Sequence, residues 1–315
     1  MSERDPTPVA VTSRSFSRNE VLRSELLARY EQVTFNDEGL SLGGDSLVDF
    51  LAGHPMAITA LEKIDDGILD RLPDLKVISK VGVGIDMIDL EAMERHDVRL
   101  GWARGTNARS VSELALALML SLLRNLPSAA RLVRQGEWRQ LQGSTLTDRT
   151  VGIIGFGHVG RDLGGLLAAF SCRVLAYDVA PIANLPSHVE QVSLESLLSA
   201  SEIVTLHTVL NDDTRNLLDR ERIAAMCPGA LIINTSRGGL VDEDALYDAL
   251  SSDHLGGAAL DVFSTEPPLD SPLLDLDQVI VTPHVGGSTK EAVLAMGRAA
   301  IAGLGEALPI AELRS

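Results

Sequence analysis

The sequence predicts an α/β protein with two domains, each built on a doubly wound parallel sheet. Strand-like and helix-like stretches alternate along residues 1–101, and a glycine-rich turn joins a strand to a helix within Val151–Phe170. Polar residues directly follow each of the later strands. Alternation of strands with helices favours a parallel sheet that is covered by helices. A chain of 315 residues is long enough for two domains of usual size.

The first 101 residues supply the first of the two sheets. Strands are expected at 8–12, 56–60, 76–79 and 98–100, and helices at 20–30, 45–51, 66–72 and 89–96. The loop Val81–Asp86 follows one of these strands and contains Gly82 and Gly84. Ligands bind at this end of the strands in parallel sheets. Two interpretations stay open: backbone N–H groups that hold a carboxylate, or a flexible turn without a ligand.

The stretch Val151–Asp178 organises the second domain and reads VGIIGFGHVGRDLGGLLAAFSCRVLAYD. An apolar strand leads directly into Gly155, Gly157 and Gly160, and a helix with leucines at helical spacing follows. The glycines permit a tight turn, close approach of a pyrophosphate, and close helix–strand packing. N–H groups at the helix N-terminus then face the phosphates. Because strand, helix and second strand are all in place, the pattern predicts a dinucleotide-binding site rather than a chance glycine turn.

Asp178 ends the second strand of this stretch and indicates which dinucleotide binds. An acid roughly 20 residues after the glycines can bond a ribose 2′-hydroxyl. A 2′-phosphate would be repelled by the carboxylate and would need a nearby arginine. The next residues are Val179, Ala180 and Pro181, none of which is basic. The sequence therefore predicts NAD rather than NADP.

Strands alternate with helices up to about Thr282. The expected strands are 203–206, 230–234, 257–261 and 279–282, with helices near 194–199, 221–226 and 242–250. Because the carboxyl ends of parallel strands share one edge of a sheet, the polar residues there should gather beside the glycine-rich turn. The dense apolar stretch Ser112–Leu123 predicts a helix buried on more than one side, in a core or a subunit interface.

Three of these polar residues suit the oxidation of a secondary alcohol by NAD. Histidine is the side-chain type best suited to take or give a proton near neutral pH, so His284 fits the role of acid and base. Glu266 beside it would orient the ring and favour its protonated form. Arg237 offers a planar fork that matches an α-carboxylate and can polarise the neighbouring carbonyl. Each of these residues taken alone is a weak signal, and their common position is what favours catalysis.

The sequence resembles the D-2-hydroxyacid dehydrogenase family, in particular its short phosphoglycerate-dehydrogenase-like members. The matching stretches cover most of the chain in conserved order: VGVGIDMIDLEA, GTNARSVSELALALML, TVGIIGFGHVGR, LHTVLNDDTRNLLD, LIINTSRGGLVDEDAL, GAALDVFSTEPP and VTPHVGGST. The resemblance implies a flavodoxin-like substrate domain, made of residues 1–101 and 285–315, and a Rossmann NAD-binding domain, 102–284. It also implies hinges at the two crossings, and a homodimer that is joined through the nucleotide domain.

The resemblance further implies site residues. Arg237, Glu266 and His284 would form the catalytic triad, and Asp261 would meet the nicotinamide carboxamide. Val83 and Gly84 would bind the substrate carboxylate together with Arg237 and His284. The implied cofactor contacts, besides the three glycines, come from His158, Val159, Asp178, Thr208, Thr214, Thr235, Ser236, Arg237, Asp261, His284 and Gly286.

Two departures from the family pattern concern the cofactor and the substrate. The fingerprint carries His158 where relatives commonly have arginine, which predicts a weaker or pH-dependent pyrophosphate contact. Many phosphoglycerate dehydrogenases place an arginine where Thr59 stands here, so that only Lys63 could meet a phosphate, while Glu62 would repel it. Candidate substrates are glyoxylate, hydroxypyruvate and 3-phosphoglycerate. The chain ends at Ser315, so no serine-binding regulatory domain is expected.

The composition excludes several other classes of protein. The net charge of −17 argues against a nucleic-acid or anionic-membrane surface. The polar N-terminus is no signal peptide, and no uncharged stretch reaches transmembrane length. Cys172 and Cys227 lack a metal or redox spacing, which predicts free buried thiols, no metal site and a cytoplasmic location. The alternative to an enzyme is an NAD(H)-sensing binding protein of the same fold.

Overall fold

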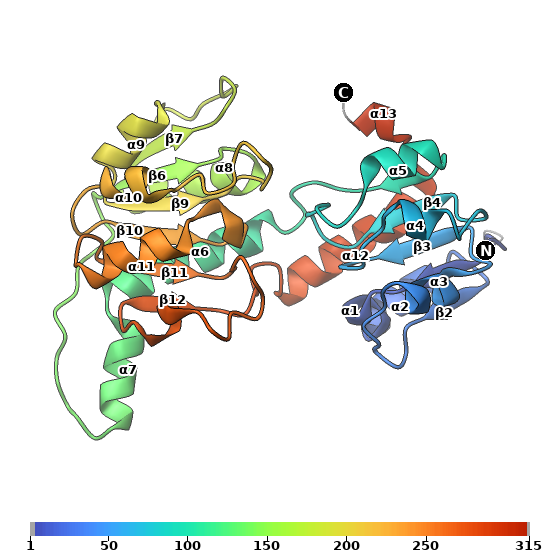
Figure 1. Cartoon of the computed structure of the whole chain (residues 1–315), viewed down its shortest axis with the longest axis horizontal. Coiled ribbons are helices and arrows are strands. Elements are labelled where there is room, and N and C mark those ends of the chain that lie inside the picture. The colour runs from blue at the N-terminus through green and yellow to red at the C-terminus, as the bar shows by residue number, and fades with distance from the viewer. Residues whose placement is uncertain (1–3, 314–315) are drawn as a thin grey trace. The chain divides into compact units, whose positions relative to one another are not determined.

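The structure is a computed structural model that describes residues 4–313. It consists of two compact units (Figure 1). The first unit comprises the residues up to Asn107 together with those from Gly287 onward, and the second unit is Ala108–Gly286. Both crossings fall later than the expected ones after residues 101 and 284. The reason is local, because a helix begins at Ala108 and the residues that follow His284 are hydrogen-bonded to Asp261 of the second unit.

The first unit contains a five-stranded parallel sheet in the order β2-β1-β3-β4-β5. This is the doubly wound order of flavodoxin-like folds. Alternate strand residues face opposite layers, as Val77 and Ile78 of β4 do. The strands are β1 Val9–Val11, β2 Val33–Phe35, β3 Met56–Thr59, β4 Val77–Lys80 and β5 Arg99–Gly101.

Helices cover both faces of this sheet. One hydrophobic layer holds side chains of α3 Asp45–Leu51, α4 Asp66–Leu69, α5 Leu90–Arg95 and α13 Ile310–Leu313. The opposite layer holds those of α1 Arg14–Ser17, α2 Glu20–Leu27 and α12 Lys290–Glu306.

The second unit contains a seven-stranded parallel sheet in the order β12-β11-β10-β9-β6-β7-β8. The strand order reverses between β6 and β9, and ligands of such sheets bind outside the carboxyl ends at this point. The strands are β6 Thr150–Ile154, β7 Arg173–Tyr177, β8 Val189–Gln191, β9 Ile203–Leu206, β10 Leu231–Asn234, β11 Gly257–Leu260 and β12 Val279–Val281.

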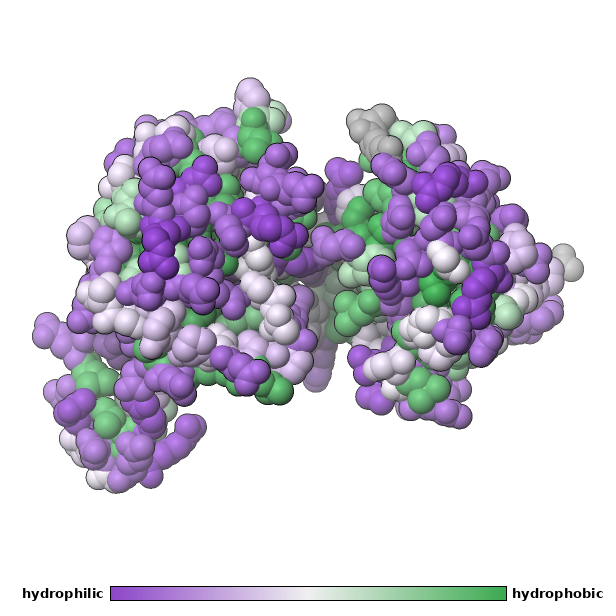
Figure 2. Space-filling view, viewed as in Figure 1, coloured by the Kyte–Doolittle hydropathy of each residue, from purple (hydrophilic) through white to green (hydrophobic). Residues whose placement is uncertain are grey.

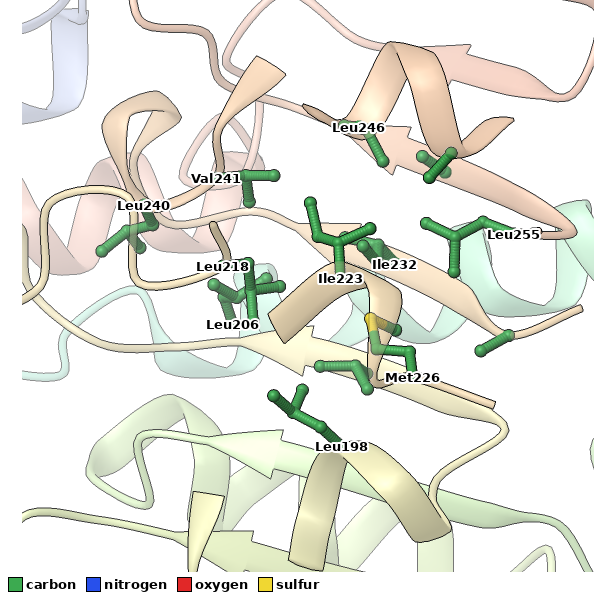
Figure 3. Close-up of a cluster of buried hydrophobic side chains, with 14 of the residues drawn as sticks. Leu198, Leu206, Leu218, Ile223, Met226, Ile232, Leu240, Val241, Leu246 and Leu255 are labelled. Carbon is green, nitrogen blue, oxygen red and sulfur yellow. The ribbon is translucent and has the colours of Figure 1, made fainter. Parts of the chain in front are cut away.

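Two hydrophobic cores flank this second sheet. One lies against α6 Ala108–Leu123 and α8 His158–Ala168. The other lies against α9 Leu194–Ala200, α10 Arg220–Ala224 and α11 Glu243–Ser251 (Figure 3). Short 3₁₀ turns at Gly238–Leu240 and Pro272–Asp275 complete the unit. The predicted fold class, two doubly wound parallel-sheet domains, is confirmed.

Capping side chains fix where many of the helices begin. A polar side chain just before the first helical residue accepts a hydrogen bond from a free N–H group of the first turn. This occurs at Asn19, Asp65, Asp89, Ser193, Asp219, Asp242 and Thr289.

The structure differs from the sequence-based elements in several places. The strands β2 and β8, each only three residues long, were not foreseen, nor were the helices α1, α12 and α13. The helix expected over 20–30 ends at Leu27, and the apolar stretch after Gly105 divides into α6 and α7 Leu126–Arg134. The division falls at Asn125, whose φ of 52° is left-handed and interrupts the helix. Cys227 is only half-buried, whereas Cys172 is buried as expected, and both are free.

Among residues 4–313, no single helix is long and apolar enough to cross a membrane. The pair α6 and α7 passes the length and composition test when taken together, although it is bent by 61°.

Candidate active site

The glycine-rich turn joins β6 to α8 at the point where the strand order reverses. Gly155 has a φ of +90°, and a Cβ there would lie 2.4 Å from the His207 carbonyl oxygen. A Cβ on Gly160 would lie 2.2 Å from the Gly155 oxygen, so the helix packs directly on the turn. A Cβ on Gly157 would meet no atom of the chain within 4 Å. Since the fold itself does not require Gly157, the open space in front of it fits a phosphate that approaches the backbone.

The Asp178 carboxylate lies beside this turn and accepts a hydrogen bond from Phe156 N at 2.9 Å through Oδ2. A cavity of about 310 Å³ opens next to it at the carboxyl ends of β6, β7 and β9. The cavity is lined by Ile154, Gly155, Tyr177, Asp178, Val179, Ser193, Leu194, Glu195, Thr208, Asp213, Thr214, Leu217 and Arg222. The placement of a carboxylate, an apolar wall and the glycine turn around one cavity fits the nucleoside end of NAD.

The remaining expected cofactor residues lie around the same sheet edge. His158 is exposed in the first turn of α8, and the Val159 oxygen accepts from Ser112 Oγ at 3.3 Å. Thr214 donates to the Val209 oxygen at 2.7 Å and so shapes the loop that lines the cavity. Ser236 follows β10 and donates to the Leu206 oxygen at 2.6 Å.

His284 and Glu266 form a direct pair in the second unit. His284 Nδ1 lies 2.8 Å from Glu266 Oε2, and Phe263 N donates to the other carboxylate oxygen at 3.2 Å. Since a carboxylate only accepts, Nδ1 carries the hydrogen and Nε2 is the atom left to meet a substrate. The two side chains are 49% and 40% exposed, so a ligand can reach them.

The backbone at His284 is left-handed, with a φ of +54°. Such a conformation is uncommon for residues other than glycine and is held by surrounding contacts. Here Asp261 supplies them, because its carbonyl oxygen accepts from His284 N at 2.9 Å. Asp261 as a whole is only 1% exposed. Its carboxylate accepts hydrogen bonds from Thr282 Oγ1, Val285 N and Gly286 N. Asp261 therefore anchors the segment that carries His284.

Arg237 follows β10 in a rigid turn. Asn234 Nδ2 donates to the Arg237 oxygen at 2.8 Å, and Arg237 Nη1 donates to the Ser236 oxygen at 2.7 Å. The next residue must be glycine, because a Cβ on Gly238 would lie 1.8 Å from the Phe263 backbone. The same close contact brings the turn of Arg237 beside the segment that leads to Glu266.

Sequence reasoning counted His207 only as one of the polar residues that follow the later strands, and it gave no reason for a buried polar row. Asn234 is in register with Leu206 and Leu260, so that Thr235, His207 and Asp261 form the next row across the sheet edge. His207 Nε2 lies 2.9 Å from Thr205 Oγ1. Within the described residues, His207 Nδ1 and Thr235 Oγ1 are enclosed without a hydrogen-bond partner. Burial lowers the pKa of His207 to about 3, which keeps the ring neutral at any working pH.

The buried ring of His207 should make the protein less stable in mild acid. Its folded pKa of about 3 lies below the ordinary value of 6.5. The folded state therefore keeps the full contribution of the neutral His207 ring above pH 6.5, and it loses this contribution as the pH falls towards 3. Between pH 6.5 and 5 this single group should remove about 2 kcal/mol from the free energy of unfolding.

Urea unfolding at both pH values, with His207→Gln beside the unchanged chain, tests this effect. Between pH 6.5 and 5, the free energy of unfolding of the variant should fall by about 2 kcal/mol less than that of the unchanged protein. An equal loss in both proteins would show that His207 is not the responsible group.

The expected substrate residues lie in the first unit. The loop after β4 has Gly82 at a φ of +105°, and Trp102 Nε1 donates to the Val83 oxygen at 2.9 Å. In the described part of the chain, the amides of Gly82, Val83 and Gly84 donate to no other group, which favours an anion-binding loop. Lys80, which we did not foresee, is 4% exposed, and its Nζ lies 2.8 Å from the Val81 oxygen. A lysine at the end of the strand-like stretch Val77–Lys80 was the available signal.

The loop after β3 does not offer a free cation among the described residues. Thr59 is 1% exposed at the end of β3. Lys63 Nζ pairs with Asp65 at 2.9 Å, and this hydrogen bond raises the pKa of Lys63. Glu62 Oε2 accepts from Ala60 N at 2.6 Å. The charge of Lys63 is thus already balanced by Asp65, and the carboxylate of Glu62 lies in the same loop.

A parallel sheet with a glycine-rich turn at its switch point, and a His–Glu pair at the same edge, defines a nucleotide-dependent oxidoreductase. Residues 116–286 match the model of the D-isomer specific 2-hydroxyacid dehydrogenase, NAD binding domain. The chain belongs to the D-isomer specific 2-hydroxyacid dehydrogenase family, and its second unit is the NAD-binding domain of that family.

Relatives and solved structures agree with this assignment. Hydroxypyruvate reductase of Thermotoga maritima is 38% identical over 281 residues, which cover 87% of this chain and 90% of that protein. D-3-phosphoglycerate dehydrogenase of Mycobacterium tuberculosis is 39% identical over 241 residues, 75% of this chain. The match spans 46% of that longer protein. The NAD complex of the NAD-dependent formate dehydrogenase of Staphylococcus aureus has a TM-score of 0.81 and 29% identity, and covers 95% of each chain.

Proposed function

We propose that this enzyme interconverts a small D-2-hydroxy acid and its 2-keto acid, with NAD as the hydride carrier. The observation that carries the proposal is the contact of 2.8 Å between His284 Nδ1 and Glu266 Oε2, at the sheet edge that holds the dinucleotide turn. When bound, NAD supplies the hydride chemistry, and the chain supplies orientation and proton transfer.

The three proposed catalytic residues have separate roles. His284 takes the hydroxyl proton through Nε2 during oxidation and returns it to the carbonyl oxygen during reduction. Glu266 fixes the tautomer and the orientation of the ring from the Nδ1 side, as its hydrogen bond to Phe263 N holds the carboxylate in place. Arg237 binds the carboxylate and polarises the carbonyl of the substrate.

The residues proposed to hold NAD lie around the turn and the cavity. Backbone N–H groups of the first turn of α8 would face the pyrophosphate. Asp178 Oδ2 is engaged by Phe156 N, so Oδ1 is the oxygen that would accept from the ribose hydroxyls. A 2′-phosphate would meet this carboxylate, and we therefore propose NAD rather than NADP. His158, exposed at the helix start, would meet the pyrophosphate.

The substrate we propose is an unphosphorylated acid such as glyoxylate or hydroxypyruvate. The amides of Val83 and Gly84 would bind its carboxylate, and the buried amine of Lys80 places positive charge beside that loop. Lys63, the expected phosphate contact, is paired with Asp65, and Glu62 would repel a phosphate. Hydroxypyruvate is also the substrate for which the Thermotoga maritima relative is named. These observations make 3-phosphoglycerate the less favoured candidate.

Initial rates with NADH should distinguish these substrates. Glyoxylate, hydroxypyruvate, pyruvate, 2-ketoglutarate and 3-phosphohydroxypyruvate would be compared, with NADPH beside NADH. We expect the highest kcat/KM for glyoxylate or hydroxypyruvate, and slower turnover with NADPH. Preference for the phosphorylated acid would contradict our interpretation of the loop of Lys63, and preference for NADPH would contradict the role of Asp178. Absence of turnover despite NADH binding would favour the alternative, an NAD(H)-sensing protein.

We also propose that the enzyme is a cytoplasmic homodimer joined through the second unit. The helix α7 projects from this unit and has no buried residue (Figure 1). Leu126 and Val133 of α7 are 51% and 52% exposed, and Trp138 in the following loop is 89% exposed. Hydrophobic residues lie among polar ones on this projection (Figure 2). Exposed aromatic and aliphatic residues on a projecting element favour a subunit contact, and the two free cysteines favour a reducing compartment.

A further inference from the structure

Gly286 is held on both sides of the chain by hydrogen bonds. Ser110 Oγ donates to the Gly286 oxygen at 2.6 Å, and Gly286 N donates to Asp261 Oδ2 at 2.8 Å. Ser110 is 7% exposed and Asp261 is 1% exposed, so water competes little for either contact. A Cβ on Gly286 would lie 3.2 Å from Asp261 Oδ2 and 3.4 Å from Val111 Cγ2. The residue is therefore enclosed between α6 and the end of β11.

This contact lies two residues from His284, whose left-handed φ of +54° needs outside support. Asp261 supports the segment from the sheet side through its contacts with His284 N, Val285 N and Gly286 N. Ser110 supports it from the helix side. Within residues 284–286, Gly286 is the residue that is hydrogen-bonded both to Asp261 and to Ser110, so its backbone position is fixed from the sheet side and from the helix side.

Gly286 is also the last residue of the second unit, and Ser110 lies near the start of the same unit. The chain crosses between the units after Asn107 and again after Gly286. The hydrogen bond from Ser110 to Gly286 thus joins the two crossings on the side of the second unit.

The hydroxyl of Ser110 differs from that of its neighbour Ser112. Ser112 Oγ donates to the Ala108 oxygen at 2.9 Å within its own helix, and it lies 3.3 Å from the Val159 oxygen of α8. Ser110 Oγ instead reaches the segment that carries His284. A serine in the first helical turn commonly serves the helix itself, and Ser110 does not.

We infer that Ser110 is a positioning residue that fixes the orientation of His284 by clamping the Gly286 carbonyl. The inference rests on the proposed role of His284 as acid and base. Ser110 itself touches neither substrate nor cofactor in this scheme, and it acts only through the backbone of residues 284–286.

Two variants of Ser110 and one control test the clamp. Ser110→Ala removes the hydroxyl, Ser110→Thr keeps it, and Ser112→Ala removes a buried hydroxyl of the same helix that does not reach Gly286. The first readout is amide hydrogen exchange of the peptide that contains residues 282–286, which requires no turnover. The second is the split between kcat and KM for NADH, measured with the best keto acid. Thermal unfolding verifies that each variant is folded.

We expect faster exchange of the 282–286 peptide in Ser110→Ala, near-normal exchange in Ser110→Thr and unchanged exchange in Ser112→Ala. The kcat of Ser110→Ala should fall by about fivefold, as the loss of one buried hydrogen bond predicts, with little change in KM for NADH. Ser110→Thr should recover most of that loss.

Unchanged exchange in a folded Ser110→Ala variant would overturn the inference. Faster exchange with an unchanged kcat would also overturn it, because the clamp would then not position His284. If the unchanged protein turns over none of the acids, the proposed function fails, and the exchange measurement still decides whether the clamp exists.

Discussion

Replacing His284 with asparagine should lower kcat by about 10²- to 10⁴-fold, the range that loss of general acid–base catalysis produces. Asparagine is the suitable replacement because it tolerates the left-handed backbone that His284 adopts, with a φ of +54°. It retains a polar side chain but cannot exchange a proton at neutral pH. Alanine would mix loss of the base with backbone strain.

Affinity for NADH should change little in this variant. The glycine turn, Asp178 and the cavity beside them lie around β6 and β7, whereas His284 follows β12. Fluorescence titration with NADH and initial rates with the best keto acid measure the two quantities separately. An unchanged kcat would rule out His284 as the acid and base, and loss of NADH binding would indicate that its main role is in the cofactor site.

The parts of the site that the sequence predicted are those set by local order along the chain. The glycine turn, Asp178 and the strand-end residues Arg237 and His284 lie where the alternation of strands and helices places them. The doubly wound rule brings such strand ends to one edge without any knowledge of side-chain contacts. We predicted the pairing of Glu266 with His284 because the reaction needs a carboxylate beside the histidine, and because both residues were expected at this edge of the sheet.

The contacts that could not be predicted depend on distances between segments far apart in the sequence. Ser110 and Gly286 are 176 residues apart and meet only in the folded chain. The sequence shows that Lys63 and Asp65 are two residues apart, but it does not show that their side chains meet. In the structure they form a surface ion pair, so that Lys63, the expected phosphate contact, already has an acidic partner. The low pKa of His207 requires knowledge of burial, which a histidine after an apolar strand does not by itself reveal.

The role of Asp261 shows the same limit and leads to a second large effect. The resemblance to the family implies a contact between Asp261 and the nicotinamide carboxamide. In the structure its carboxylate already accepts from Thr282 Oγ1, Val285 N and Gly286 N. One acceptor position on Oδ2 is left for a further donor, so both roles are compatible. The structural role should dominate, because three donors depend on a buried charge.

Asp261→Asn should therefore lower the free energy of unfolding by about 3 kcal/mol, since an amide nitrogen would face at least one backbone N–H group and the charge would be lost. The kcat should fall by about 10²-fold, because a small displacement of His284 disturbs its alignment with the substrate. Urea unfolding and initial rates measure these effects. Asp242→Asn is a matched control, because Asp242 caps α11 through Ala245 N at 3.0 Å, and asparagine caps nearly as well.

The pattern of losses in Asp261→Asn distinguishes its two roles. Weaker NADH binding with normal stability and kcat would mean that Asp261 acts on the carboxamide alone. Lower stability and kcat with nearly normal NADH binding would mean that it anchors the His284 segment. The second result is the one expected, because His284 N also bonds to the backbone oxygen of Asp261, so that one residue fixes the segment through main chain and side chain together.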